Sequence, residues 1–211
     1  MLCLGGLPLR NGFVTFGSEP STGLLDLLVD RVDRVVAAGF GPGQDTNVWS
    51  ADAGKAFVIK RLTATGAPDT GFGDAGKVVV DFGYSSHQTQ VIDDIATSLQ
   101  LTASGKLLVV GSSSSQTGSP GQRRIAMARL TESGALDPSF AFTDKRLEIQ
   151  TMGAQIHRAP ESANTFTRQI AVLPDGTGGL LGITAKPRYS VNNNVQPIIA
   201  ADTPVMLQFW D

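Results

Sequence analysis

The sequence has few of the residues from which redox, metal and disulfide chemistry is built. Its 211 residues include one cysteine, Cys3, and two histidines, His87 and His157. One cysteine cannot form an internal disulfide, and neither a Cys-x-x-Cys pair nor an EF-hand spacing supplies ligands for zinc or calcium. We therefore expect no metal site and no cofactor.

Excess charge and long apolar runs are also missing. The chain has 17 basic and 19 acidic residues without a basic cluster, so a nucleic-acid partner is not expected. No apolar run approaches the roughly 20 residues of a membrane helix, so no membrane insertion is expected. The N-terminal segment, MLCLGGLPL, lacks the basic region and the cleavage site of a signal peptide, and Met1 can equally lie at the boundary of a fragment of a longer protein. These features do not indicate a cellular compartment.

Glycine and proline, in contrast, are abundant. The 24 glycines and 11 prolines interrupt short runs of valine, isoleucine and leucine every few residues. This pattern favours many short strands and tight turns over long helices. We predict an all-β fold, with residues 1–211 forming a single repeat domain.

One stretch of the chain occurs twice. KRLTATGAPDTGF at 60–72 returns as ARLTESGALDPSF at 128–140, and Leu62 and Leu130 are 68 residues apart. Glycine, aspartate and phenylalanine keep the same offset without a gap. Self-similarity at a fixed period indicates stacked supersecondary units.

Strand-like segments follow the same period, in the order D, ABCD, ABCD, ABC. The units span about 24–83, 92–150 and 168–211, and a first D strand at 12–17 could complete the last unit. The expected A strands are 24–32, 92–101 and 168–173, and the expected B strands are 35–40, 106–111 and 179–184. The expected C strands are 56–62, 125–130 and 205–210, and the remaining D strands are 77–82 and 146–150.

Each A–B pair is predicted to be a β-hairpin. TASG at 102–105 and LPDG at 173–176 place glycine where a tight turn needs a positive φ. Asp33 replaces that glycine in the first unit, which should weaken its turn. The glycine that closes strand B, at Gly39, Gly111 and Gly182, repeats after 72 and 71 residues.

These motifs resemble a known repeat. LTASGKLLVVGSS at 101–113, ARLTESGALDPSF at 128–140 and GKVVVDFG at 76–83 are similar to the bacterial Delta-60 repeat. The pattern is degraded in the third unit and at 142–152. The resemblance implies four-stranded antiparallel blades of a β-propeller, a scaffold role, and an extracytoplasmic or cell-surface location.

Three blades are fewer than the four to eight that close a propeller ring. Two copies of the chain could form a six-bladed ring, or the chain could be an arc of a longer propeller. An open array is the third arrangement, and its exposed edge strands would invite aggregation.

Several motifs that suggest chemistry have a structural explanation. GFGDAG at 71–76 fits a dinucleotide-binding pattern, but a strand rather than a helix follows it. Asp69-Thr70-Gly71 matches the aspartic-protease triplet, yet the second unit keeps only Asp137, so we interpret this Asp as the cap of a turn. SADAGKAF at 50–57 resembles the Asp-box hairpin, itself a folding element. The adjacent Asp93 and Asp94 should point to opposite faces of a strand.

Recurring residues are predicted to hold the blades together. Arg61 with Asp69, and Arg129 with Asp137, could form an ion pair within each blade. The recurring or strand-borne phenylalanines should pack in the core; they are Phe57, Phe72, Phe82 and Phe140.

The rare side chains gather in long polar connections. The B–C segments 41–55, 112–123 and 186–204 and the D–A segments 84–90 and 155–167 should emerge at one end of the blades. Loops grouped on a rigid scaffold are where binding is usually found, although packed blade faces would exclude such residues in any case. The candidate binding residues are Trp49, Tyr84, His87, His157, Arg158, Tyr189 and Asn193.

The sequence is compatible with two functions. The first is a non-catalytic binding or structural module that presents the loop face to a protein or glycan. Such a module is expected to self-associate or to belong to a larger protein assembly. The alternative is a propeller enzyme, a glycan hydrolase or lyase. Hydrolysis usually needs two carboxylates about 5 to 10 Å apart, and the loop acids are scattered, which favours binding; they are Asp45, Asp52, Glu161 and Asp202.

Overall fold

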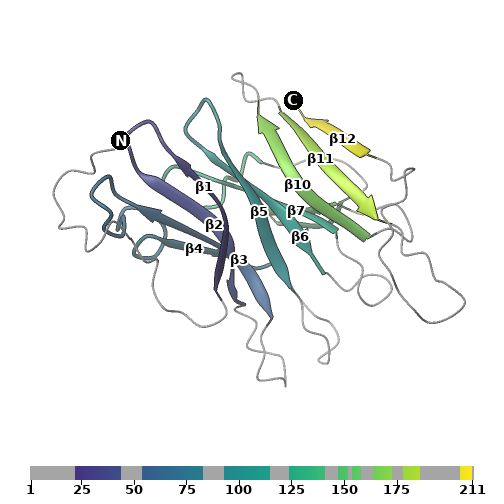
Figure 1. The fold of residues 1–211 in the computed structure, drawn as a ribbon, viewed down its shortest axis with the longest axis horizontal. Coiled ribbons are helices and arrows are strands. Elements are labelled where there is room, and N and C mark those ends of the chain that lie inside the picture. The colour runs from purple at the N-terminus through teal and green to yellow at the C-terminus, as the bar shows by residue number, and fades with distance from the viewer. Residues whose placement is uncertain are drawn as a thin grey trace, which may run out of the picture.

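The computed structural model describes four stretches with their side chains, and the backbone of the strands that follow residue 146. The stretches are 22–43, 54–82, 93–114 and 125–140, with the backbone of Arg124 at the start of the last one. The later strands occupy 147–151, 154–157, 164–172, 178–185 and 205–210. All regular elements in this part of the chain are strands, arranged as three antiparallel sheets side by side (Figure 1). None of the described residues belongs to a helix long and apolar enough to cross a membrane.

The first sheet has four strands that follow one another in chain order. They are β1 (Gly23–Val29), β2 (Val35–Pro42), β3 (Lys55–Leu62) and β4 (Lys77–Val80). Each strand pairs antiparallel with the next. This is the predicted ABCD unit, consistent with a propeller blade.

The second sheet has five strands, and its D position differs from the prediction. Its order is β5 (Asp94–Leu101), β6 (Leu107–Ser113), β7 (Arg124–Leu130), β9 (Ala154–His157) and β8 (Leu147–Thr151). The segment predicted beside strand C, 146–150, is therefore the edge strand β8, and β9 takes the place next to β7. The sequence signal for β9 is the alternation of apolar and polar residues in AQIH, most of which falls in the segment predicted as a polar D–A connection, 155–167.

The third sheet contains β10 (Asn164–Val172), β11 (Gly178–Ala185) and β12 (Val205–Trp210) in chain order. Strand β12 has the predicted bounds, and β10 begins four residues earlier than predicted. The D strand predicted at 12–17 lies outside the described residues.

A β-bulge in each A strand explains the glycine that recurs in strand B. The register shifts between Leu24 and Asp26 in β1, and at the matching place in β5 and β10. A Cβ on Gly39 would lie 1.9 Å from the carbonyl oxygen of Gly23, and one on Gly111 equally close to that of Ile95. Only glycine lets the bulged strand come this near.

The A–B hairpins form in both of the first two sheets, with or without glycine. Gly105 has a φ of 79° and Asp33 a φ of 61°, so the aspartate adopts the left-handed conformation that its turn requires. Asp30 Oδ1 accepts the backbone N–H groups of Val32 and Arg34, which holds this turn. The LPDG turn of the third unit lies outside the described residues.

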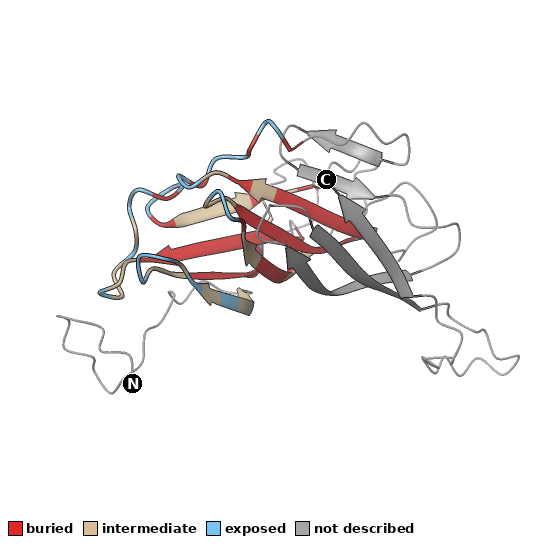
Figure 2. Cartoon of the chain, turned by 90° about the horizontal axis from the view of Figure 1, so that it is seen from above, coloured by how far each residue is buried: buried red, intermediate tan, exposed pale blue. Residues whose placement is uncertain are grey.

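Among the residues whose burial is described, the core lies between the first and second sheets (Figure 2). Strand β5 contacts β1, β2 and β3, and β10 contacts β5, β6 and β7, so the three sheets stack in chain order. Ala96, Leu99 and Val109 from the second sheet pack with aliphatic residues of the first. The prediction that the four phenylalanines are core residues is confirmed, since Phe57, Phe72, Phe82 and Phe140 are all buried.

Candidate binding site between the first two sheets

The strands of the first two sheets define two ends of the molecule. At one end, which we name the loop end, the pairing of β2 with β3 ends at Pro42 and Lys55. The pairing of β6 with β7 ends there at Ser113 and Arg124. The opposite end, which we name the turn end, carries the short connections 30–34, 63–76, 102–106 and 131–140. Antiparallel strands alternate in direction, so the A–B and C–D connections share an end.

The recurring arginine and aspartate form an ionic cluster at the turn end of the first sheet. Arg61 Nε donates to Asp69 Oδ2 at 2.8 Å, and its guanidinium lies 4.3 Å from the centre of the Phe72 ring. Asp69 Oδ1 accepts the Gly71 N–H, so Asp69 also caps a turn, as predicted. The following stretch continues into β4, which confirms that GFGDAG precedes a strand.

The second sheet repeats this cluster. Arg129 Nε donates to Asp137 Oδ2 at 2.6 Å, and Arg129 stacks on Phe140 at 4.8 Å. Both predicted intra-sheet ion pairs are therefore confirmed. Burial acts to raise the pKa of Asp137, but hydrogen bonds from Lys106, Ser139 and Arg129 outweigh it and hold that pKa well below its ordinary value. The carboxylate stays ionised and structural.

In the first sheet, the cluster also joins the two sheets. Arg61 Nη1 donates to the Glu132 carbonyl oxygen at 2.7 Å, and the Gly73 N–H donates to the Ser133 carbonyl at 2.9 Å. The turn of the second sheet therefore sits on the C–D connection of the first. Arg34 adds a bridge, since its Nη2 lies 3.2 Å from Glu132 Oε1.

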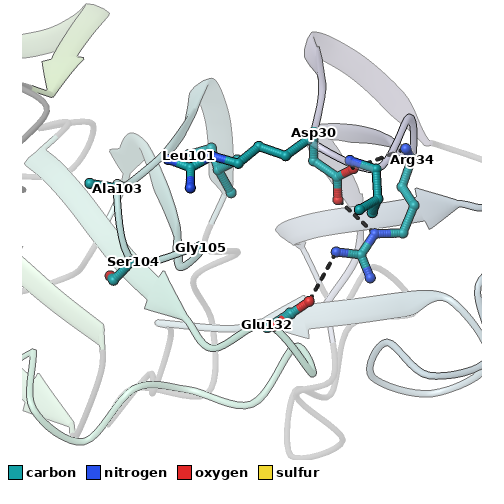
Figure 3. A pocket seen from close by; sticks show the side chains of 9 residues that line it. Asp30, Arg34, Leu101, Ala103, Ser104, Gly105 and Glu132 are labelled. Carbon is teal, nitrogen blue, oxygen red and sulfur yellow. Dashed lines mark hydrogen bonds and ion pairs between the residues drawn. The ribbon is translucent and has the colours of Figure 1, made fainter.

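A pocket of about 310 Å³ opens beside this joint (Figure 3). Asp30 and Arg34 come from the β1–β2 turn, Ser104 and Gly105 from the β5–β6 turn, and Glu132 from the turn after β7. The remaining lining residues are Arg31, Val32, Leu101 and Ala103.

Asp30 and Arg34 in the pocket hold each other in the ionised state. Arg34 Nε lies 2.6 Å from Asp30 Oδ2. Burial acts to raise the pKa of Asp30, but the hydrogen bonds from Arg34 and the Val32 N–H lower it overall. Burial likewise acts to lower the pKa of Arg34, and the bonds to Asp30 and Glu132 raise it overall. The pocket can offer hydrogen bonds to a small polar group.

The segment that contains the second cluster has a counterpart among known families. Residues 102–140 match a family described as Domain of unknown function (DUF5122) beta-propeller. No curated protein matches the chain significantly. The DUF5122 stretch runs from the β5–β6 turn through Phe140, and so contains β6, β7 and the Arg129–Asp137 pair.

Before the DUF5122 stretch, at the loop end, lies an unusual buried carboxylate. Asp94 is fully buried at the start of β5 and accepts the Phe82 N–H at Oδ2, 2.9 Å away. Among the described residues, its Oδ1 and the hydroxyl of Ser113, its partner in the strand pairing, meet no partner at hydrogen-bond geometry. Burial raises the pKa of Asp94 to about 7. The neighbouring Ser113 hydroxyl and the Phe82 N–H act to lower this pKa, and the carboxylates of Asp81 and Asp93 act to raise it further.

The two adjacent aspartates behave as different groups. Asp93 Oδ2 lies 3.2 Å from Lys55 Nζ in a partly exposed ion pair between the sheets, whereas Asp94 points into the core. This confirms that they face opposite sides of the strand. Within the described stretches, no three His, Cys, Asp or Glu residues are arranged to hold a metal ion.

Most residues of the predicted loop-face site lie outside the described residues; they are Trp49, Tyr84, His87, Arg158, Tyr189 and Asn193. His157, which the prediction placed in a loop, is the last residue of β9, paired with Ile125 and Leu147. Sequence reasoning missed the joint formed by Arg34 and Glu132. Its only signal was a charged residue at each of two turns, because their contact spans 98 positions of the chain.

Proposed function

We propose that the chain is a non-catalytic propeller module that presents its loop end to a protein or glycan partner. The observation that carries the proposal is the use of the repeated charged residues. Arg61 and Asp69 connect neighbouring sheets and cap a turn, and so act as parts of the scaffold. A frame stabilised in this way leaves the variable connections available for recognition.

The geometry of the loop end supports the same proposal. The connections that follow Pro42 and Ser113 both leave the sheets at this end. The Lys55–Asp93 ion pair fixes the two sheets relative to each other there. Connections from adjacent sheets therefore start and end at the same end of the molecule.

The test is a binding and turnover assay on arrayed glycans and peptides, with the labelled chain. We expect the double variant Trp49→Ala/Tyr189→Ala to bind the recovered ligand at least about tenfold more weakly, as for loss of aromatic anchors. Leu136→Ala, which truncates an exposed hydrophobic residue at the turn end, is the matched control and should leave affinity unchanged.

Two results would contradict the proposal. Unaltered affinity in the double variant would remove the loop end as the binding surface. Release of products from a bound glycan over time would show an enzyme instead. Circular dichroism of each variant separates lost binding from lost folding.

A further inference from the structure

One face of the first sheet exposes an apolar strip at β1. Leu25, Leu27 and Val29 are all large exposed hydrophobic residues, and we name them the outer strip. On the other side of β1, Leu28 packs against the core, and Asp26 Oδ2 accepts the Leu99 N–H of the second sheet. The outer strip therefore faces away from the second sheet. A row of exposed aliphatic side chains on a strand marks a contact surface.

The second sheet shows what these positions do when a neighbour is present. The shared bulge and the Gly39/Gly111 pairing make Leu27 equivalent to Leu99, and Val29 equivalent to Leu101. Leu99 is 7% exposed, in the core between the sheets, whereas Leu27 is 66% exposed. The same strand position is thus buried by a preceding sheet in one case and open in the other.

The turns after the C strands show the same difference. The carbonyl oxygens of Glu132 and Ser133 accept hydrogen bonds from the preceding sheet. Their equivalents in the first sheet are Ala64 and Thr65, whose carbonyl oxygens accept no hydrogen bond from the described residues. The first sheet therefore repeats both parts of the contact between the first two sheets. The apolar part is the outer strip, and the polar part is the pair of carbonyl oxygens of Ala64 and Thr65. Both could contact another sheet that packs against this face.

We propose that the outer strip docks the third sheet of a second copy of this chain. The first and third sheets lie on opposite sides of the second sheet, so each chain has a sheet at either side of the row (Figure 1). Strand β10 keeps the bulge, and Gln169 occupies the register position that Asp26 has in β1. Leu99 of the second sheet packs against β1 of the first sheet, and β10 of the third sheet has the same bulge and strand register as β1.

A second copy is a better occupant than the chain's own third sheet. Propeller rings close with about four to eight blades, and the three described sheets are too few for their faces to meet. Two copies joined head to tail at both junctions bring six sheets together, and the two-fold symmetry closes the ring. The joint would continue the packing already present between the first and second sheets.

Light scattering with Leu27→Lys tests the interface. Across a concentration series the unchanged chain should have twice the chain mass, and Leu27→Lys should have the mass of one chain. Leu136→Lys is the matched control, because Leu136 is also an exposed hydrophobic residue but lies at the turn end. A monomeric unchanged chain, or a Leu27→Lys variant that still forms dimers, would overturn the proposal.

Disulfide trapping tests which sheets meet. Cys3 is first replaced by serine, and chains with Leu27→Cys are mixed with chains that carry Gln169→Cys. We expect the mixture to give cross-linked pairs that contain one chain of each kind, because Leu99 meets Asp26 at the equivalent positions. Cross-links only between two Leu27→Cys chains would show a face-to-face dimer, and a cross-link within a doubly substituted chain would show that its own third sheet docks. Either result would refute the head-to-tail arrangement.

Discussion

Replacement of Asp94 by asparagine should stabilise the protein at neutral and alkaline pH. Asp94 is fully buried, its Oδ2 accepts the Phe82 N–H, and its Oδ1 accepts no hydrogen bond at good geometry from the described residues. Asparagine keeps an acceptor for the Phe82 N–H. Its amide nitrogen can also donate to the neighbouring Ser113 hydroxyl.

The magnitude follows from the pKa of Asp94, which burial raises from 3.8 to about 7. Because the folded-state pKa is the higher one, the unfolded chain loses its proton first as pH rises. The contribution of Asp94 to the free energy of unfolding should therefore be greatest below about pH 4, fall up to about pH 7, and then level off. The two pKa values correspond to a loss of roughly 2 to 4 kcal/mol, allowing for relaxation around the ionised group.

Urea unfolding of both proteins between pH 4 and pH 8 measures this effect. Asp94→Asn should match the unchanged protein within about 1 kcal/mol at pH 4 and exceed it by roughly 2 to 4 kcal/mol at pH 8. Asp93→Asn is the control, since that partly exposed ion pair with Lys55 should contribute less than about 1 kcal/mol. Parallel profiles for Asp94→Asn and the unchanged protein would refute the reasoning.

Two matched pairs test the scaffold by urea unfolding. Arg61→Ala should cost about 3 kcal/mol, because Arg61 is 4% exposed and joins two sheets, whereas Arg129→Ala should cost about 1 kcal/mol, because Asp137 keeps Lys106 as a partner. Equal losses would contradict the role of Arg61 between sheets. Gly111→Ala should cost about 3 kcal/mol or more, since its Cβ would lie 1.9 Å from a carbonyl oxygen. Gly105→Ala, with open space but a φ of 79°, should cost only about 1 kcal/mol, and a reversed order would count against the bulge explanation.

The sequence predicted the repeated local elements well. The strands of the first sheet follow from runs of β-branched residues between turns, and the C–D element follows from Arg, Asp and Phe at a fixed spacing. These features depend on residues close together in the chain. An arginine eight positions before an aspartate meets it across one turn, wherever the sheet sits.

The order of strands in the second sheet could not be obtained in the same way. Both 147–151 and 154–157 have strand-like patterns, and either could pair with β7. Pairing of β9 with β7 on one side and β8 on the other satisfies its backbone on both edges. A sequence pattern shows that a strand exists but does not identify its neighbours.

The sequence alone therefore determined the all-β class, the repeat period, the hairpins and the Arg61–Asp69 and Arg129–Asp137 pairs, because each depends on short-range spacing. Only the tertiary structure decided which equivalent residues differ in environment. Leu27 and Leu99 occupy the same position in their repeats, yet one is exposed and the other buried, because only the second sheet has a described sheet before it. The contact between Arg34 and Glu132 exists because the second sheet packs beside the first. The outer strip is exposed because no described sheet packs against it.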